Sequence, residues 1–189
     1  MTWYNPNTWF SKANPAQQMI SLEQGSYIGS DYSVNYATAF DKLETVNRGV
    51  NMIVSACSSL DYDIKDKISD GIAKGLRVKS LHQLLNYRPN PYQSAQEFRS
   101  NIFTDFILEG NTFLYFDGAF LYHLPANQVV IETDPKTYVS HYTYSSTIKF
   151  MPDEIVHIKD LSSTSIYRGT SRLAAADRNI KILYKMMSF

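Results

Sequence analysis

The spacing of apolar residues changes abruptly at Gly110. Upstream, between Ser94 and Gly110, apolar side chains recur at three- and four-residue steps, which is the period of an amphipathic helix. Downstream, in NTFLYFDGAFLYHL (residues 111–124), aromatic-rich runs alternate with a period of two around an Asp-Gly pair that favours a hairpin turn. Gly110 and Asn111 therefore mark a switch from helix to strand, and the chain must contain both kinds of element.

The segment before this switch carries signals for a turn and a helix start. In LLNYRPNPYQSAQEF (residues 84–98), Pro89 ends one helix because proline disfavours the helical conformation of the residue before it. Ser94 and Glu97 match a capping box, in which each side chain hydrogen-bonds the backbone amide of the other. Phe98 begins the apolar face of the next helix. We expect a rigid turn that sets the angle between two packed helices, formed by Pro89, Asn90 and Pro91.

Similar patterns extend this mixture of elements along the chain. One helix is expected from about Phe40 to Leu60, with Ile53 on its apolar stripe. Alternating runs predict strands at 128–133, 138–144, 147–151 and 154–159, which gives an α+β fold: an antiparallel meander with packed helices. A last helix is expected from Ser171, with an inward face of Leu173, Ala176, Ile180, Leu183 and Met187.

Two segments have no sustained period. Residues 1–37 are rich in aromatic residues, asparagine and proline, which predicts an extended arm whose tryptophans dock on this domain or on a neighbouring subunit. Residues 61–80 mix basic and acidic side chains, which predicts an exposed hairpin. A nucleic-acid patch would instead need an unbalanced basic run with interleaved aromatic residues.

The composition limits the classes of partner. Eighteen basic and eighteen acidic side chains cancel, so the molecule has no long-range field for a polyanion. The single cysteine, Cys57, excludes an intrachain disulfide and indicates a reducing compartment. No signal peptide and no window of about 18 apolar residues are apparent, so we expect a soluble protein without membrane contact.

Motifs for catalysis, cofactors and metals are not found in the sequence. Its four histidines have no ligand spacing, and the scattered glycines form neither a Walker loop nor a dinucleotide fingerprint. Asp153 and Glu154 are adjacent in a predicted turn, where neighbouring side chains point in different directions and cannot act as a paired acid and base. The sequence therefore predicts a protein that is not an enzyme and has no cofactor or metal.

One alternative is a nucleic-acid-binding module. Tyr138, Tyr142 and Tyr144 share one face of a predicted strand and could stack on bases, as in proteins that bind single strands. A basic helix face could contribute phosphate contacts through Arg178, Lys181 and Lys185. Because no basic stripe accompanies the tyrosines, a face buried by helices or by another subunit explains them with fewer assumptions.

An ordered set of short motifs resembles the portal proteins of tailed double-stranded-DNA bacteriophages, in the long-tailed siphophage branch. The motifs are VNRGVNMIVSACSSL, the SLHQLL to FLYFDG segment, LYHLPANQVVIE, DEIVHIKD and YRGTSRLAAA. The resemblance covers roughly residues 38–189. The family's G-x-S-P-L helix start appears here as Gly169, Thr170, Ser171, Arg172 and Leu173, without its proline.

This resemblance implies a structural role. Residues 38–170 would form a portal wing domain, and residues 171–189 the start of a long helix towards a stem; a helix without a C-cap signal at Phe189 agrees with a longer product. Family members form a ring, usually of twelve subunits, at one capsid vertex of the virion, assembled in the host cytoplasm. The implied partners are the major capsid protein, the terminase, the head-tail connector and the DNA that passes through the channel.

Overall fold

The computed structural model describes residues 35–64 and 76–187. The predicted arm up to residue 34 and the centre of the predicted exposed hairpin lie outside the described residues. Where the edges of these segments are described, the structure differs from the prediction. Tyr36 and Ala37 belong to a helix, and residues 76–80 are helical as well.

The predicted helix from 40 to 60 is two helices, α2 (Tyr36–Lys42) and α3 (Glu44–Ser58). The break is at Leu43, whose backbone is extended and whose side chain is buried. Only Val46, Val50 and Val54 of α3 are buried hydrophobic residues, a narrow ridge at four-residue steps. Ile53, predicted to be in the core, lies beside this ridge and is 52% exposed, and Leu60 lies beyond the end of the helix.

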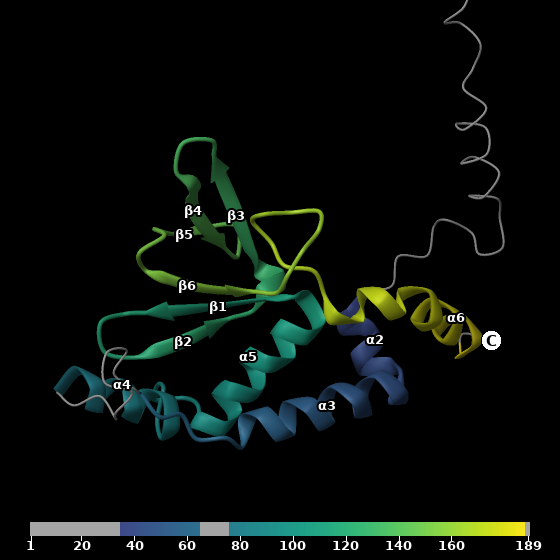
Figure 1. Cartoon of the computed structure of the whole chain (residues 1–189), viewed down its shortest axis with the longest axis horizontal. Coiled ribbons are helices and arrows are strands. Elements are labelled where there is room, and N and C mark those ends of the chain that lie inside the picture. The colour runs from purple at the N-terminus through teal and green to yellow at the C-terminus, as the bar shows by residue number, and fades with distance from the viewer. Residues whose placement is uncertain (1–34, 65–75, 188–189) are drawn as a thin grey trace, which may run out of the picture. The chain divides into compact units, whose positions relative to one another are not determined.

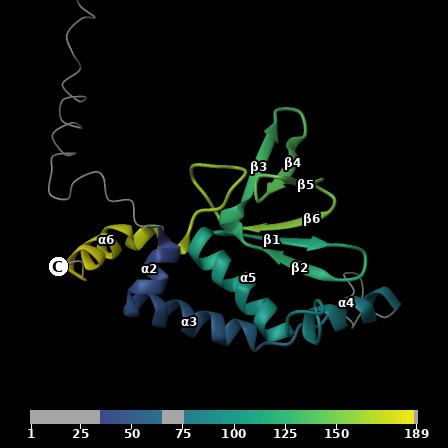
Figure 2. The same ribbon diagram turned by 180° about the vertical axis from the view of Figure 1, so that it is seen from behind.

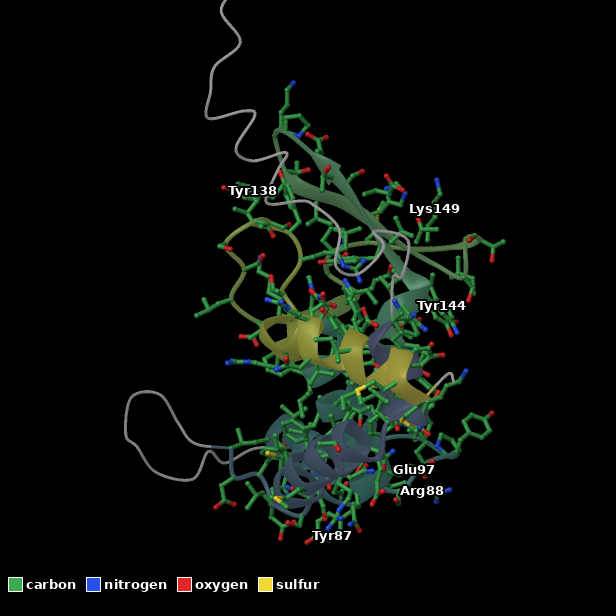
Figure 3. The ribbon with its side chains drawn as sticks, turned by 90° about the vertical axis from the view of Figure 1, so that its right-hand side faces the viewer. Tyr87, Arg88, Glu97, Tyr138, Tyr144 and Lys149 are labelled. Atoms are coloured by element: carbon green, nitrogen blue, oxygen red, sulfur yellow. The ribbon has the colours of Figure 1, made fainter. Side chains whose placement is uncertain are left out.

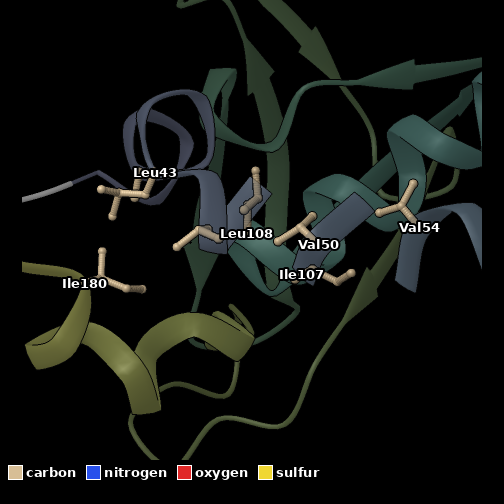
Figure 4. Close-up of a cluster of buried hydrophobic side chains, with 8 residues drawn as sticks. Leu43, Val50, Val54, Ile107, Leu108 and Ile180 are labelled. Atoms are coloured by element: carbon tan, nitrogen blue, oxygen red, sulfur yellow. The ribbon is translucent and has the colours of Figure 1, made fainter. Parts of the chain in front are cut away.

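The first core cluster joins helices from both ends of the described chain. Leu43, Val50 and Val54 pack against Ile107 and Leu108 of α5 (Ala95–Glu109) and against Ile180 of α6 (Asp177–Met187) (Figure 4). In Figures 1 and 2, α3 runs below α5, and α6 lies beside α2. The remaining helix, α4 (Leu76–Asn86), precedes the Pro89–Pro91 turn.

In the described residues, six strands form two antiparallel sheets of three. Sheet 1 has the order β2-β1-β6, and sheet 2 has the order β3-β4-β5. β6 therefore pairs with β1, with Phe113 opposite His157. It does not pair with β5, the strand that precedes it in the sequence, as a simple meander would require. The strands are β1 (Asn111–Phe116), β2 (Leu121–Leu124), β3 (Val129–Asp134), β4 (Tyr138–Tyr144), β5 (Ile148–Phe150) and β6 (Ile155–Lys159).

Sheet 1 packs against neighbouring elements on both faces. On one face, Phe113 and Ile155 pack with Val129 and Tyr142 of sheet 2. On the other face, Leu114 and Leu121 pack with Phe98 of α5, which crosses beneath the sheet in Figure 1. The fold class is α+β, as predicted.

The last helix begins later than predicted. A 3-10 turn, η3 (Arg172–Ala176), follows Ser171, and α6 begins at Asp177. Ile180 is buried, but Leu183 and Met187, predicted to point inward, are 41% and 67% exposed. Among the described residues, α6 has too few neighbours to cover a full apolar stripe, so only the ridge that faces the first core cluster is buried. None of the helices in the described ranges is long and apolar enough to cross a membrane.

Candidate functional site

Two glycines that are far apart in the sequence bring two backbone segments into direct contact. Gly110 ends α5 in the left-handed conformation, with φ of 67°. A Cβ atom at Gly110 would overlap the carbonyl group of Thr170, and one at Gly169 would overlap the carbonyl oxygen of Gly110 and the backbone of Asp160. We call residues 110–111 and 169–171 the glycine junction. Only glycine permits this approach of one backbone to the other.

Asn111 holds the junction together from its centre. Its side chain is buried, and its Oδ1 accepts a hydrogen bond of 2.8 Å from the amide of Gly169. Its Nδ2 donates to the carbonyl oxygens of Glu109 (2.7 Å) and Gly169 (3.2 Å). One side-chain amide therefore satisfies both backbone groups of a segment 58 residues away.

Ser171 closes the same junction from the other side. Its hydroxyl donates to the carbonyl oxygen of Ile107, at 3.2 Å, and accepts from the amide of Leu173, at 3.0 Å. Arg172, where the family pattern has proline, forms an ion pair with the buried carboxylate of Asp160. The residues singled out in the sequence as two separate motifs thus lie in one place.

His157 on β6 supports Asn111. Its ring stacks on Phe113 with centroids 4.3 Å apart, and its Nε2 lies 3.1 Å from the Oδ1 of Asn111. Burial, followed by the charges of Lys159 and Arg168, lowers the pKa of His157 to about 4. The ring is therefore neutral at pH 7, and Nε2–H donates to the asparagine.

The Pro89–Pro91 turn contacts the sheet as well as joining two helices. Asn90 is 1% exposed, and its Nδ2 donates to the carbonyl oxygen of Leu121, at 2.9 Å. The amide of Leu121 in turn donates to the carbonyl oxygen of Pro89, at 2.9 Å. The amide of Tyr92 donates to the Oδ1 of Asn90. This turn therefore holds the start of β2, a contact that the local sequence signals do not reveal.

The helix start after this turn matches half of the capping box. The Ser94 hydroxyl accepts a hydrogen bond from the amide of Glu97, at 3.2 Å. The side chain of Glu97 is exposed at the surface (Figure 3) and makes no return bond to Ser94 in the described part of the chain. Phe98, next along the helix, is fully buried.

Sequence patterns do not reveal two arginines that bond backbone carbonyl groups, the buried Arg99 and the half-buried Arg168. Arg99 is 6% exposed and donates to the carbonyl oxygens of Ser58 and Leu85, at 2.8 and 3.1 Å. Arg168 donates to the carbonyl oxygens of Ala126 and Val129, both at 3.1 Å. The helical position of Arg99 indicates its burial, because Arg99 shares a helix face with the apolar residues three, four and seven positions further along the chain.

The parts of the alternative nucleic-acid site are not brought together. Tyr142 is buried in the core, and Tyr138 and Tyr144 lie at opposite ends of β4 (Figure 3). The basic residues Arg178, Lys181 and Lys185 lie on α6, which lies beside α2 and away from sheet 2 in Figures 1 and 2. Lys181 is paired with Asp177, at 2.7 Å.

Within residues 35–64 and 76–187, no group of three or more histidine, cysteine or acidic side chains could hold a metal ion.

Two viral portal proteins are similar to this chain in sequence. The chain is similar to the portal protein of Escherichia phage T5, with 32% identity over 189 residues that cover 96% of this chain and 47% of that protein. The portal protein of Enterobacteria phage HK97 is 28% identical over 198 residues, covering 97% of this chain and 46% of that protein. The chain thus spans about half the length of these relatives.

Solved structures show the same fold at low sequence identity. The neck of an empty gene transfer agent particle matches with a TM-score of 0.69 and 17% identity, covering 93% of this chain and 50% of that chain. An HK97-family phage portal protein from Corynebacterium diphtheriae matches with a TM-score of 0.54 and 13% identity, covering 80% of this chain and 46% of that chain. The phage portal protein family model matches residues 44–189. The chain therefore belongs to the phage portal protein family.

Proposed function

We propose that this chain is the N-terminal part of a portal subunit, a structural component of the phage virion. The observation that carries the proposal is the family match over residues 44–189, supported by the identity to the T5 portal protein. In this proposal the subunits form a ring at one capsid vertex, through which double-stranded DNA is packaged and later ejected. The mechanism is geometric, and the protein has no catalytic role.

The ring is proposed to contain twelve copies. The neck of the native gene transfer agent particle, similar in fold with a TM-score of 0.67, is described with C12 symmetry, which supports this number. Head-to-tail contacts between identical subunits close into a ring when the rotation between neighbours divides a full turn. The proposed partners besides other copies are the major capsid protein, the terminase, the head-tail connector and the translocated DNA.

Residues 38–170 are proposed to be the wing domain, and residues 171–189 to lead towards a stem. The glycine junction supports this division because it joins the end of α5, the first sheet and the start of the last helix through backbone contacts. Such contacts leave α6 little freedom to swivel relative to sheet 1. A wing with a fixed exit direction suits a subunit whose neighbours must all be related by one rotation.

The test is to express the full-length product that contains this chain and image it by negative-stain electron microscopy. We expect closed rings with twelvefold symmetry in the end-on views. A product that stays monomeric at every concentration up to about 100 μM would overturn the proposal, because 100 μM is well above the dissociation constants of specific assemblies. A Gly49→Ala variant is the control, since a Cβ atom at Gly49 meets no atom within 4 Å.

A further inference from the structure

We propose that an apolar cavity between α5 and sheet 1 binds a small carboxylic acid with an apolar body. The cavity has a volume of about 460 Å³ and, among the described residues, is not enclosed on one side. Phe98, Ile102 and Phe106 of α5 form one wall, and Leu114 and Ile158 of sheet 1 form another. Cavities of about 300–1,000 Å³ with apolar walls are typical of sites for small ligands.

The cavity exists because sheet 1 is wider than the helix beneath it. α5 packs against β1 and β2, and β6 lies at the far edge of the sheet order. Ile158 on β6 is consequently 42% exposed, although it pairs with the fully buried Thr112 of β1. None of the residues of the glycine junction lines this cavity, so it is a separate feature of the fold.

A buried cation on the cavity wall selects for an acid. Arg99 lines the cavity, and its acceptors are the backbone carbonyls of Ser58 and Leu85 and the side-chain amide of Asn86, all of them neutral. Its Nη2 has no acceptor, and its guanidinium no carboxylate partner, among the described residues. Asp63 also lines the cavity, but it is exposed and forms no ion pair with Arg99. A buried charge without a counter-charge favours an anionic ligand.

A second polar group on the same cavity lacks a partner. The hydroxyl of Thr112, another lining residue, is buried and has no hydrogen-bond partner in the part of the chain that the structure describes. Buried polar groups in proteins are nearly always paired. The oxygen of this hydroxyl has almost no accessible surface, so the acid must be held by the guanidinium of Arg99, to which a carboxylate offers two acceptor oxygens. Because the other lining residues are mainly apolar, the rest of the ligand must be apolar too.

The test compares 2-naphthoic acid with 2-naphthamide, two ligands of nearly equal shape that differ in charge. Ligand-observed NMR with the 189-residue chain measures both affinities. We expect saturable binding of the acid with a dissociation constant on the order of 1 mM, given the few non-hydrogen atoms of the probe. The amide should bind at least about tenfold more weakly, because it loses a charge-assisted hydrogen bond.

Two variants on one strand locate the site without altering Arg99. Ile158→Trp places an indole at the cavity wall and should abolish binding of the acid. Val156→Trp is the matched control: Val156 is 54% exposed, lies two residues away on the same strand, and does not line the cavity. It should bind the acid as the wild type does. Equal affinities for acid and amide, no binding below about 10 mM, or equal losses in both tryptophan variants would overturn the proposal.

Discussion

Replacing Gly169 with alanine tests the glycine junction directly. The new Cβ atom would overlap backbone atoms of Gly110 and Asp160, which cannot rotate out of the way as a side chain could. Overpacking of this kind costs about 1–3 kcal/mol. If the two segments separate to relieve it, the paired bonds between Asn111 and Gly169 and the bond from Asp160 to Gly110 weaken, each worth about 1 kcal/mol. Because separation relieves the overlap, the two costs are alternatives, and we expect the free energy of unfolding to fall by about 3 kcal/mol.

The assay is urea unfolding followed by far-UV circular dichroism, with thermal melting as a second readout. A loss of this size lowers the melting temperature by about 10 °C in a domain of this length. Gly49→Ala is the matched control, because it makes the same chemical change in α3 with open space around it. It should stabilise the helix by up to about 1 kcal/mol. A Gly169→Ala variant whose free energy of unfolding lies within about 0.5 kcal/mol of the wild type, the usual range for surface substitutions, would show that the two backbone segments are not in direct contact.

Three further predictions follow from the same structure. The pKa of His157 is lowered to about 4 from an ordinary 6.5. Between these pH values the unfolded chain binds more protons than the folded chain, so the free energy of unfolding falls as the pH drops from 6.5 to 4. Because the ring is partly exposed, we expect this loss to be about 1–2 kcal/mol. Urea titrations at several pH values should show a flatter profile for His157→Gln, whose amide can still donate to Asn111. Thr112→Val removes an unpaired buried hydroxyl at constant volume and should raise the free energy of unfolding by about 1 kcal/mol; a loss of stability would show that the hydroxyl has a partner. Light scattering of the 189-residue chain should give a monomer or a weak, concentration-dependent association, and a stable ring would contradict this.

Local signals predicted most of the elements correctly. The strand at 138–144 and the hairpin around Asp117 follow from alternation and from residues that tolerate positive φ, both of which act within a few positions of the chain. The end of α5 at Gly110 is local in the same sense, since the left-handed cap needs only the glycine itself. These features depend on short-range sterics and hydrogen bonds, which the sequence displays directly.

Features that depend on distant partners could not be read in the same way. Alternation shows that residues 154–159 form a strand. It does not show that this strand pairs with β1, because a period-two pattern does not identify the strand with which it pairs. No glycine or proline marks the helix break at Leu43. The burial of this leucine and the packing of α2 and α3 outweigh the local preference for one continuous helix. The contact of Gly110 with Gly169 is likewise invisible when each glycine is considered alone.

Arg99 and Arg168 show how side chains of the described domain bond the backbone of distant segments. Arg99 binds carbonyl groups at the ends of α3 and α4, and Arg168 binds the carbonyl groups of Ala126, the first residue of the η2 turn (Ala126–Gln128), and of Val129, which follows the turn. Carbonyl groups at the end of an α-helix have no partner within the helix, so Arg99 satisfies them while its stem fills apolar space. Arg168 also precedes Gly169 directly, so it holds one side of the glycine junction against sheet 2 while Asn111 holds the other against sheet 1. The loop that leads to the last helix is thereby hydrogen-bonded to η2 and β3 through Arg168 and to Asn111 at the start of β1 through Gly169.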